Sequence, residues 1–119
     1  MKTLYKISTL LILALGLLHI SMTFVMFPGL TPGALWFVSG GIVIIFLSFF
    51  NFILMGGAGN QRVVRMLTHT ANLVGLLFAA TMLIIESRRG RPGALSWFVL
   101  ALFVFETVAA VRYPSRSSV

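Results

Sequence analysis

Four long apolar segments alternate with short polar breaks along the chain. They cover about residues 7–27, 34–55, 63–85 and 94–111, and each is close to the ~20 residues that cross a bilayer as a helix. Helices are expected because hydrocarbon offers no partner to the backbone groups of an open strand edge. The pattern predicts an all-α polytopic membrane protein, a four-transmembrane-helix bundle made of two helical hairpins.

The breaks contain the residues that end helices, such as the Pro-Gly pairs after residues 27 and 91 and the glycines after residue 55. The first apolar run continues to Phe27 with no cleavage signal, so we expect a retained helix and not a signal peptide. The 119 residues are expected to form a single membrane domain with a disordered tail at about 114–119.

Two stretches of the chain are similar in sequence. Residues 31–38 read TPGALWFV, and residues 91–99 read RPGALSWFV with one insertion. Each precedes the second segment of a predicted hairpin, which is consistent with a parallel internal repeat about an axis along the membrane normal. The alternative is that both are common helix starts at the outer interface.

Composition and charge narrow the class of protein. With 59% hydrophobic and 9% charged residues, the chain could not hide its apolar surface as a soluble domain. The net charge of +7 comes from basic residues at the termini and connections, so no nucleic-acid partner is expected. Six basic residues on one side against three on the other predict both termini in the cytoplasm, in the cytoplasmic membrane of a bacterium. Interfacial residues on the outer side are expected to be Trp36, Trp97, Glu86, Arg88, Arg89 and Arg91.

Glu106 lies inside the last apolar segment, and the chain has only two acidic residues in total. An ionisable group at membrane depth costs several kcal/mol, at least ~2.5 by insertion scales, so it indicates a functional site and needs a partner. The candidate partners are the other strongly polar residues of the apolar segments, namely His19, Asn51, His69 and Asn72.

Helical periodicity places these residues on inward faces. The third segment carries a small-residue packing seam of Ala71, Gly75 and Ala79 on the same side as its polar residues. At ~1.5 Å per residue, Asn51, His69 and Glu106 lie about 6–9 Å from the inner ends of their helices. Asn72 lies about 13 Å and His19 about 18 Å from the inner end. We therefore expect a Glu106–His69–Asn51 cluster, extended outward by Asn72 and His19.

Three functions remain open for this polar set. It could bind a proton, a cation or a small amphipathic ligand at Glu106, as in a small proton-coupled transporter. It could instead be assembly glue in a non-catalytic accessory subunit of a larger membrane complex. It could also serve a small membrane enzyme that acts on a lipid or isoprenoid, with Glu106 as general acid and His69 as proton partner. Enzymatic activity is the less favoured class, and no catalytic residue is assigned beyond these candidates.

No cofactor is expected. Haem ligation by His19 and His69 is disfavoured by their depth difference of about 9 Å. A metal site of His19, His69 and Glu106 is disfavoured because no two histidines are spaced at i, i+4. The absence of cysteine excludes thiolate ligands. The expected partners are the lipid bilayer and either further copies of the chain or partner membrane subunits.

The size and the four-segment layout resemble those of small multidrug-resistance transporters. That family carries its carboxylate in the first helix, whereas the first segment here has His19 and no acid. The resemblance therefore concerns architecture alone, and it assigns no role to any residue.

Overall fold

The protein is almost entirely helical. The computed structural model describes residues 1–114. Within that range it contains no strand and consists of α1 (Lys2–Met26), α2 (Pro32–Met55), the short 3-10 helix η1 (Gly57–Asn60), α3 (Arg62–Arg89) and α4 (Ala94–Arg112). All four α-helices are long and apolar enough to cross a membrane, so the all-helical prediction is confirmed for these residues. Apart from Pro114, the predicted tail lies outside the described residues.

Two helices extend beyond the apolar segments. α1 begins at Lys2, and α3 continues to Arg89. The apolar pattern identifies only the part of a helix that hydrocarbon can surround. Lysine and arginine can continue that helix because their long side chains carry the charge outward to water and headgroups.

The two similar sequences start their helices differently. The side chain of Thr31 accepts a hydrogen bond from the backbone N–H of Ala34 at 3.1 Å, which caps α2 and places Pro32 in its first turn. Arg91 occupies the position of Thr31 in the second of these sequences, and a guanidinium cannot accept such a bond. Helix α4 has no side-chain cap, and it begins only after Pro92.

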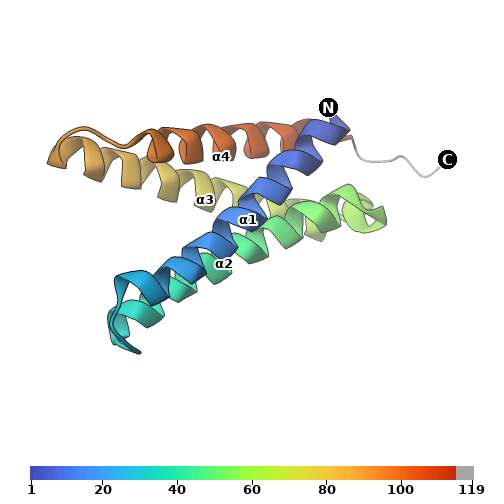
Figure 1. Ribbon diagram of the computed structural model, residues 1–119. Helices are drawn as coiled ribbons and strands as arrows, with labels where there is room; N and C mark the ends of the chain where they lie inside the picture. Colours follow the sequence, from blue (N-terminus) through green and yellow to red (C-terminus); the bar gives the residue numbers. More distant parts are fainter. Residues whose placement is uncertain (115–119) are drawn as a thin grey trace.

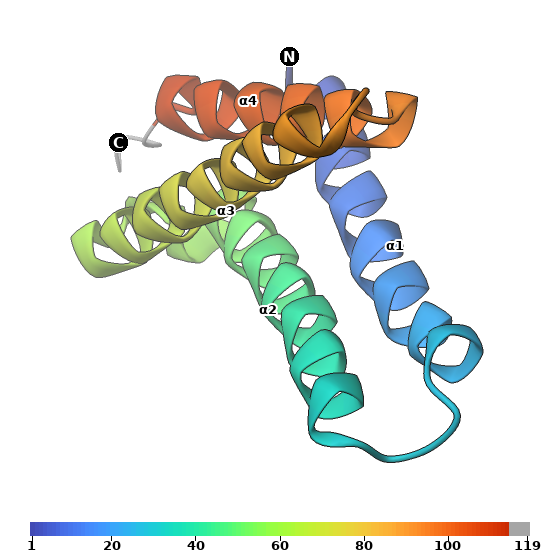
Figure 2. The same ribbon diagram turned by 90° about the vertical axis from the view of Figure 1, so that its left-hand side faces the viewer.

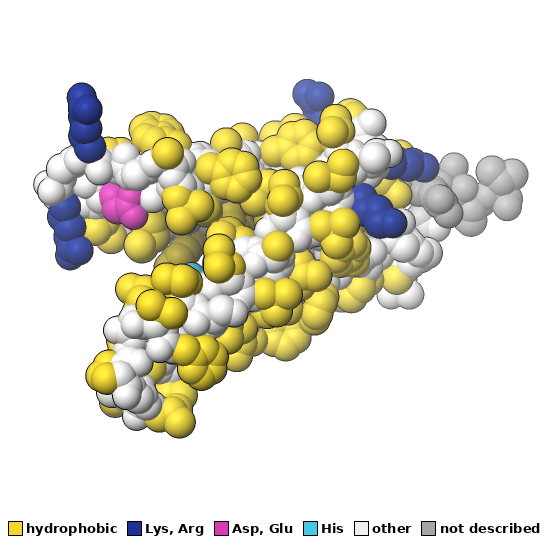
Figure 3. All heavy atoms as spheres, viewed as in Figure 1, with side chains coloured by type: hydrophobic (Ala, Val, Ile, Leu, Met, Phe, Trp, Pro, Cys, Tyr) yellow, Lys and Arg dark blue, Asp and Glu magenta, His cyan; other side chains and the backbone are white. Residues whose placement is uncertain are grey.

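The helices form two hairpins that cross steeply. α1 lies against α2, and α3 lies against α4 (Figure 1). The hairpins meet where both ends of the described chain and the α2–α3 connection lie, which we call the terminal end. They diverge toward residues 27–31 and 90–93, the loop end (Figure 2). Apolar side chains cover both arms, and basic side chains gather at the two extremes (Figure 3).

Glycines allow the helices to approach closely. A Cβ atom on Gly41 would lie 2.9 Å from the Gly16 carbonyl oxygen and 3.2 Å from the Ile20 nitrogen, so the backbones of α1 and α2 are almost in contact. A Cβ on Gly75 would lie 2.5 Å from Phe103 Cε1 and 2.7 Å from Leu47 Cδ1. Gly75 therefore gives side chains of α2 and α4 room against α3.

The contact at Gly41 yields a stability prediction. Gly41→Ala should destabilise the protein by about 1–3 kcal/mol, because backbone atoms of α1 cannot move aside without separating the hairpin. The measurement is unfolding of the detergent-solubilised protein. Gly57→Ala is the control, since a Cβ there meets nothing within 4 Å. Equal stability of the two variants would contradict the close contact.

Candidate functional site

Glu106 of α4 is fully buried against α1. The hydroxyl of Ser8 hydrogen-bonds to its Oε2, and the Thr9 hydroxyl lies 2.5 Å from its Oε1. Consecutive residues on a helix point about 100° apart, so the carboxyl group lies between two hydroxyls of one turn of α1. This contact joins the first and last helices of the chain.

The same two hydroxyls also reach a backbone acceptor. Ser8 Oγ and Thr9 Oγ1 each lie 2.9 Å from the carbonyl oxygen of Tyr5. A hydroxyl has one proton to donate but can also accept. With ionised Glu106, both hydroxyls can donate to the carboxylate. With protonated Glu106, the acid can donate to one hydroxyl, which then donates to Tyr5. The site therefore has a hydrogen-bonding arrangement for either protonation state.

A second buried network joins the hairpins through amides. Asn51 Nδ2 donates to Asn72 Oδ1 at 2.7 Å and to the Leu47 carbonyl at 2.9 Å. Asn51 Oδ1 accepts from Asn72 Nδ2 at 2.9 Å and from the Tyr5 hydroxyl at 2.6 Å. All four hydrogen-bonding positions of the Asn51 amide are used. The network therefore fixes α1, α2 and α3 relative to one another.

The two networks form a polar layer between apolar clusters. On the side of the terminal end, Tyr5 packs with Leu54, Ala109 and Ala110. The cluster on the other side, toward the loop end, consists of Ile12, Leu47, Ala79, Leu102 and Phe103, with Ala71 packed against it. Tyr5 links both networks. Its carbonyl lies within hydrogen-bond distance of the Ser8 and Thr9 hydroxyls, and its own hydroxyl donates to Asn51.

The structure brings together only part of the predicted set. Asn51 lies with Asn72, but Glu106 is hydrogen-bonded to α1 and not to His69 or Asn51. The Nδ1 atom of His69 is buried without a hydrogen-bond partner among the described residues. His19 stacks on Phe37, with ring centroids 3.9 Å apart and planes at 12°. The expected Glu106–His69–Asn51 cluster is therefore not formed, because the arrangement of the hairpins turns Glu106 toward α1 and Asn51 toward Asn72 of α3.

Ser8 and Thr9 are not among the partners predicted for Glu106 from the sequence. Ser8 lies six residues from the start of α1, and Glu106 lies six residues from the end of α4. Both starting points are at the terminal end, so both residues lie about 9 Å from it. Depth along the helix, applied to serine and threonine as well, would have added Ser8 as a candidate, but depth alone could not have chosen it over His69 and Asn51.

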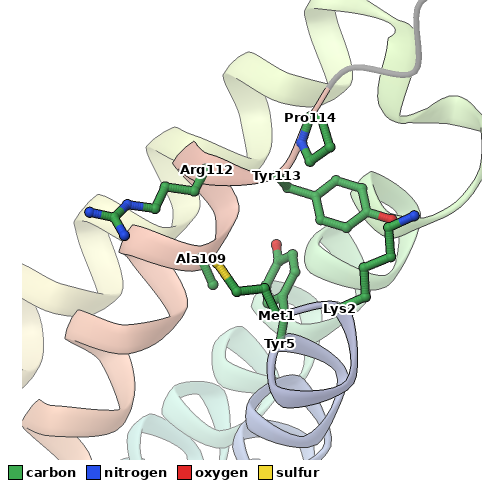
Figure 4. A pocket seen from close by; sticks show the side chains of 7 residues that line it. All are labelled: Met1, Lys2, Tyr5, Ala109, Arg112, Tyr113 and Pro114. Atoms are coloured by element: carbon green, nitrogen blue, oxygen red, sulfur yellow. The ribbon is translucent and has the colours of Figure 1, made fainter.

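A pocket of about 280 Å³ opens at the terminal end beside the polar layer. Tyr5 and Ala109 line it from α1 and α4 (Figure 4). Tyr5 precedes Ser8 by three residues, and Ala109 follows Glu106 by three, so the pocket lies about 4.5 Å along the helices from the acid. Glu106 itself does not line the pocket.

The predicted interfacial residues lie toward the loop end. Ser96 Oγ donates to Glu86 Oε2 at 2.5 Å and ties the start of α4 to the last turns of α3. An acidic side chain is visible there with basic side chains on either side (Figure 3). The large rings of Trp36 and Trp97 are exposed near the starts of α2 and α4.

The amide pair yields a second prediction. In a double-mutant cycle, Asn51→Leu and Asn72→Leu should show a coupling of about 0.6–1.7 kcal/mol, because either change alone leaves the other amide unpaired. Unfolding of the detergent-solubilised variants measures the cycle. Asn51→Leu with Thr81→Ala is the control, since exposed Thr81 bonds only to its own helix, at the Leu77 carbonyl. Additive effects in the asparagine cycle would show that the pair does not contribute.

The chemistry available in the polar layer is proton exchange at a carboxyl group and hydrogen bonding through amides and hydroxyls. Across residues 1–114, no group of three His, Cys, Asp or Glu side chains could hold a metal ion. Comparisons with protein-family models, curated proteins and solved structures give no match to this chain.

Proposed function

We propose that the chain is a small integral membrane protein in which Glu106 takes up and releases a proton, as the proton site of a small proton-coupled transporter. The observation that carries the proposal is the pairing of a fully buried carboxyl group with two hydroxyls that can donate or accept. Ser8 and Thr9 are neutral, so neither offers Glu106 the opposite charge that would hold it ionised.

A fixed structural clasp would have a simpler solution. An asparagine or glutamine between the same hydroxyls would hold the helices with no cost of ionisation, as the Asn51–Asn72 pair does in the same polar layer. The use of an acid here supports a titrating role.

The surroundings of Glu106 support a proton site that is accessible from the terminal end only. The pocket at the terminal end lies one helical turn from the acid, whereas an apolar cluster that contains Ile12 and Phe103 closes the layer toward the loop end. Transport would require the hairpins to move so that Glu106 becomes accessible from the other side, as in alternating access between two helical units.

Infrared difference spectroscopy can test proton binding directly, because Glu86 and Glu106 are the only acidic side chains. A pH change should alter the carboxyl C=O band of the wild-type protein in detergent. Glu106→Gln should abolish the component from the buried acid while preserving the fold, since glutamine still bonds to both hydroxyls. Glu86→Gln is the matched control and should retain that component. A spectrum that Glu106→Gln leaves unchanged would refute proton binding at Glu106.

We also propose that both termini face the cytoplasm of a bacterial cell. Five basic residues of the described range lie at the terminal ends of α1, α3 and α4, against three at the loop end, and the five are Lys2, Lys6, Arg62, Arg65 and Arg112. The orientation would let the pocket beside Glu106 open to the cytoplasm.

Single cysteines test this orientation, because the chain has no cysteine of its own. Gly29→Cys should react with a membrane-impermeant thiol reagent in intact cells. Gly57→Cys should react only after the cells are opened, since positively charged ends are retained on the cytoplasmic side. A Cβ at either glycine meets nothing within 4 Å, so both variants should fold. The reverse labelling pattern would invert the proposed topology.

An accessory subunit is the second candidate, favoured by the angle between the hairpins. α1 and α4 contact each other less than any other neighbouring α-helices, and the arms diverge toward the loop end (Figure 2). A partner membrane subunit or a second copy of the chain would fill this angle with helices. This role would be favoured if the chain purifies only together with other membrane subunits and if Glu106→Gln leaves the carboxyl infrared band unchanged.

A further inference from the structure

The terminal end carries two pockets, the one beside the proton site and a second that the proton site does not use. One has a volume of about 280 Å³ and the other about 340 Å³, and both are lined by Lys2 and Tyr113. The larger pocket also contains Lys6, Phe52, Met55 and Gly56. Lys2 and Lys6 are four residues apart on α1, so both ammonium groups project from the same helix face.

The lysines have no acidic side chain to pair with at this end. Glu86 lies near the loop end, and Glu106 is buried and bonded to Ser8 and Thr9. Arg65 adds a further positive charge beside Tyr113, because its Nη2 donates to the Tyr113 carbonyl at 3.2 Å. Its Nη1 is buried with no acceptor among residues 1–114. This region therefore has an excess of positive charge around a recess.

The start of α1 adds a further preference for an anion. Among the described residues no side chain caps this helix, whose N-terminal end favours negative charge, and Lys2 in the first turn lines both pockets. Figure 4 shows Lys2 and Tyr113 at the pocket, whereas the Arg112 guanidinium points away from it. Lys2 and Lys6 are thus the cations placed to hold an anionic group.

We propose that the larger pocket, which we call the recess, binds the phosphate headgroup of an anionic phospholipid. Lys2 and Lys6 supply its positive charges, and Tyr113 forms part of its wall. The lipid source follows from the location. The recess lies at the end of four helices long enough to cross a bilayer, where headgroup phosphates are the abundant anions. Phe52 and Met55 line the same recess and would contact the acyl chains below the headgroup.

Native mass spectrometry of the protein in detergent can test the proposal with phosphatidylglycerol, phosphatidylcholine and inorganic phosphate as probes. Phosphatidylglycerol should be retained in preference to phosphatidylcholine. Each lost cation should weaken binding about fivefold, so Lys2→Gln/Lys6→Gln should weaken it about 25-fold. Lys2→Arg/Lys6→Arg should preserve binding, which separates charge from misfolding.

The matched control removes the same charge at the loop end. Arg88→Gln/Arg89→Gln should change phosphatidylglycerol binding less than twofold. Equal losses in the two double variants, or equal retention of both lipids, would overturn a defined site at the terminal end. Displacement of phosphatidylglycerol by millimolar inorganic phosphate would overturn the lipid as the ligand. These outcomes are independent of the infrared signal of Glu106.

Discussion

The fold depends on the burial of one carboxyl group between two hydroxyls. Glu106 can occupy hydrocarbon depth only where partners surround it, and those partners come from a single turn of α1. Because α1 and α4 contact each other over a short length, the polar contact fixes where the hairpins meet. The Asn51–Asn72 pair fixes the second point of contact, between α2 and α3. Together they join two otherwise apolar hairpins at one level of the structure.

Close packing stabilises the first hairpin internally, whereas hydrogen bonds join the two hairpins. Within the first hairpin, Gly16 and Gly41 let the backbones approach, and dispersion over the whole length stabilises the pair. Between hairpins the specific contacts are hydrogen bonds, concentrated in one layer near the terminal end. Close packing favours rigid hairpins, whereas a few directional bonds at one level allow the angle between the arms to change. Such an arrangement would serve the proposed movement of the hairpins about Glu106.

The helices could be predicted from the sequence, but much of the polar site could not. Uninterrupted apolar runs determine where hydrocarbon can surround a helix, and therefore α2 and α4 begin and end close to the predicted segments. Glu106 and Asn51 are buried, in keeping with their cost in lipid. Their partners depend on how the two hairpins pack against each other, which the apolar pattern does not specify. Upright helices at equal depth would favour His69 beside Glu106. The crossing instead places Ser8 and Thr9 there, residues common enough in membrane helices to carry little signal.

The double use of the Tyr5 carbonyl has a consequence for biogenesis. Until the last helix arrives, the Ser8 and Thr9 hydroxyls can turn to that carbonyl within their own helix, so the first hairpin can enter the bilayer with those groups satisfied. The hydrogen bonds of Glu106 are to α1 and not to groups of its own helix. Because α4 follows α1 along the chain, the hydroxyls that bind Glu106 are synthesised before the acid that needs them.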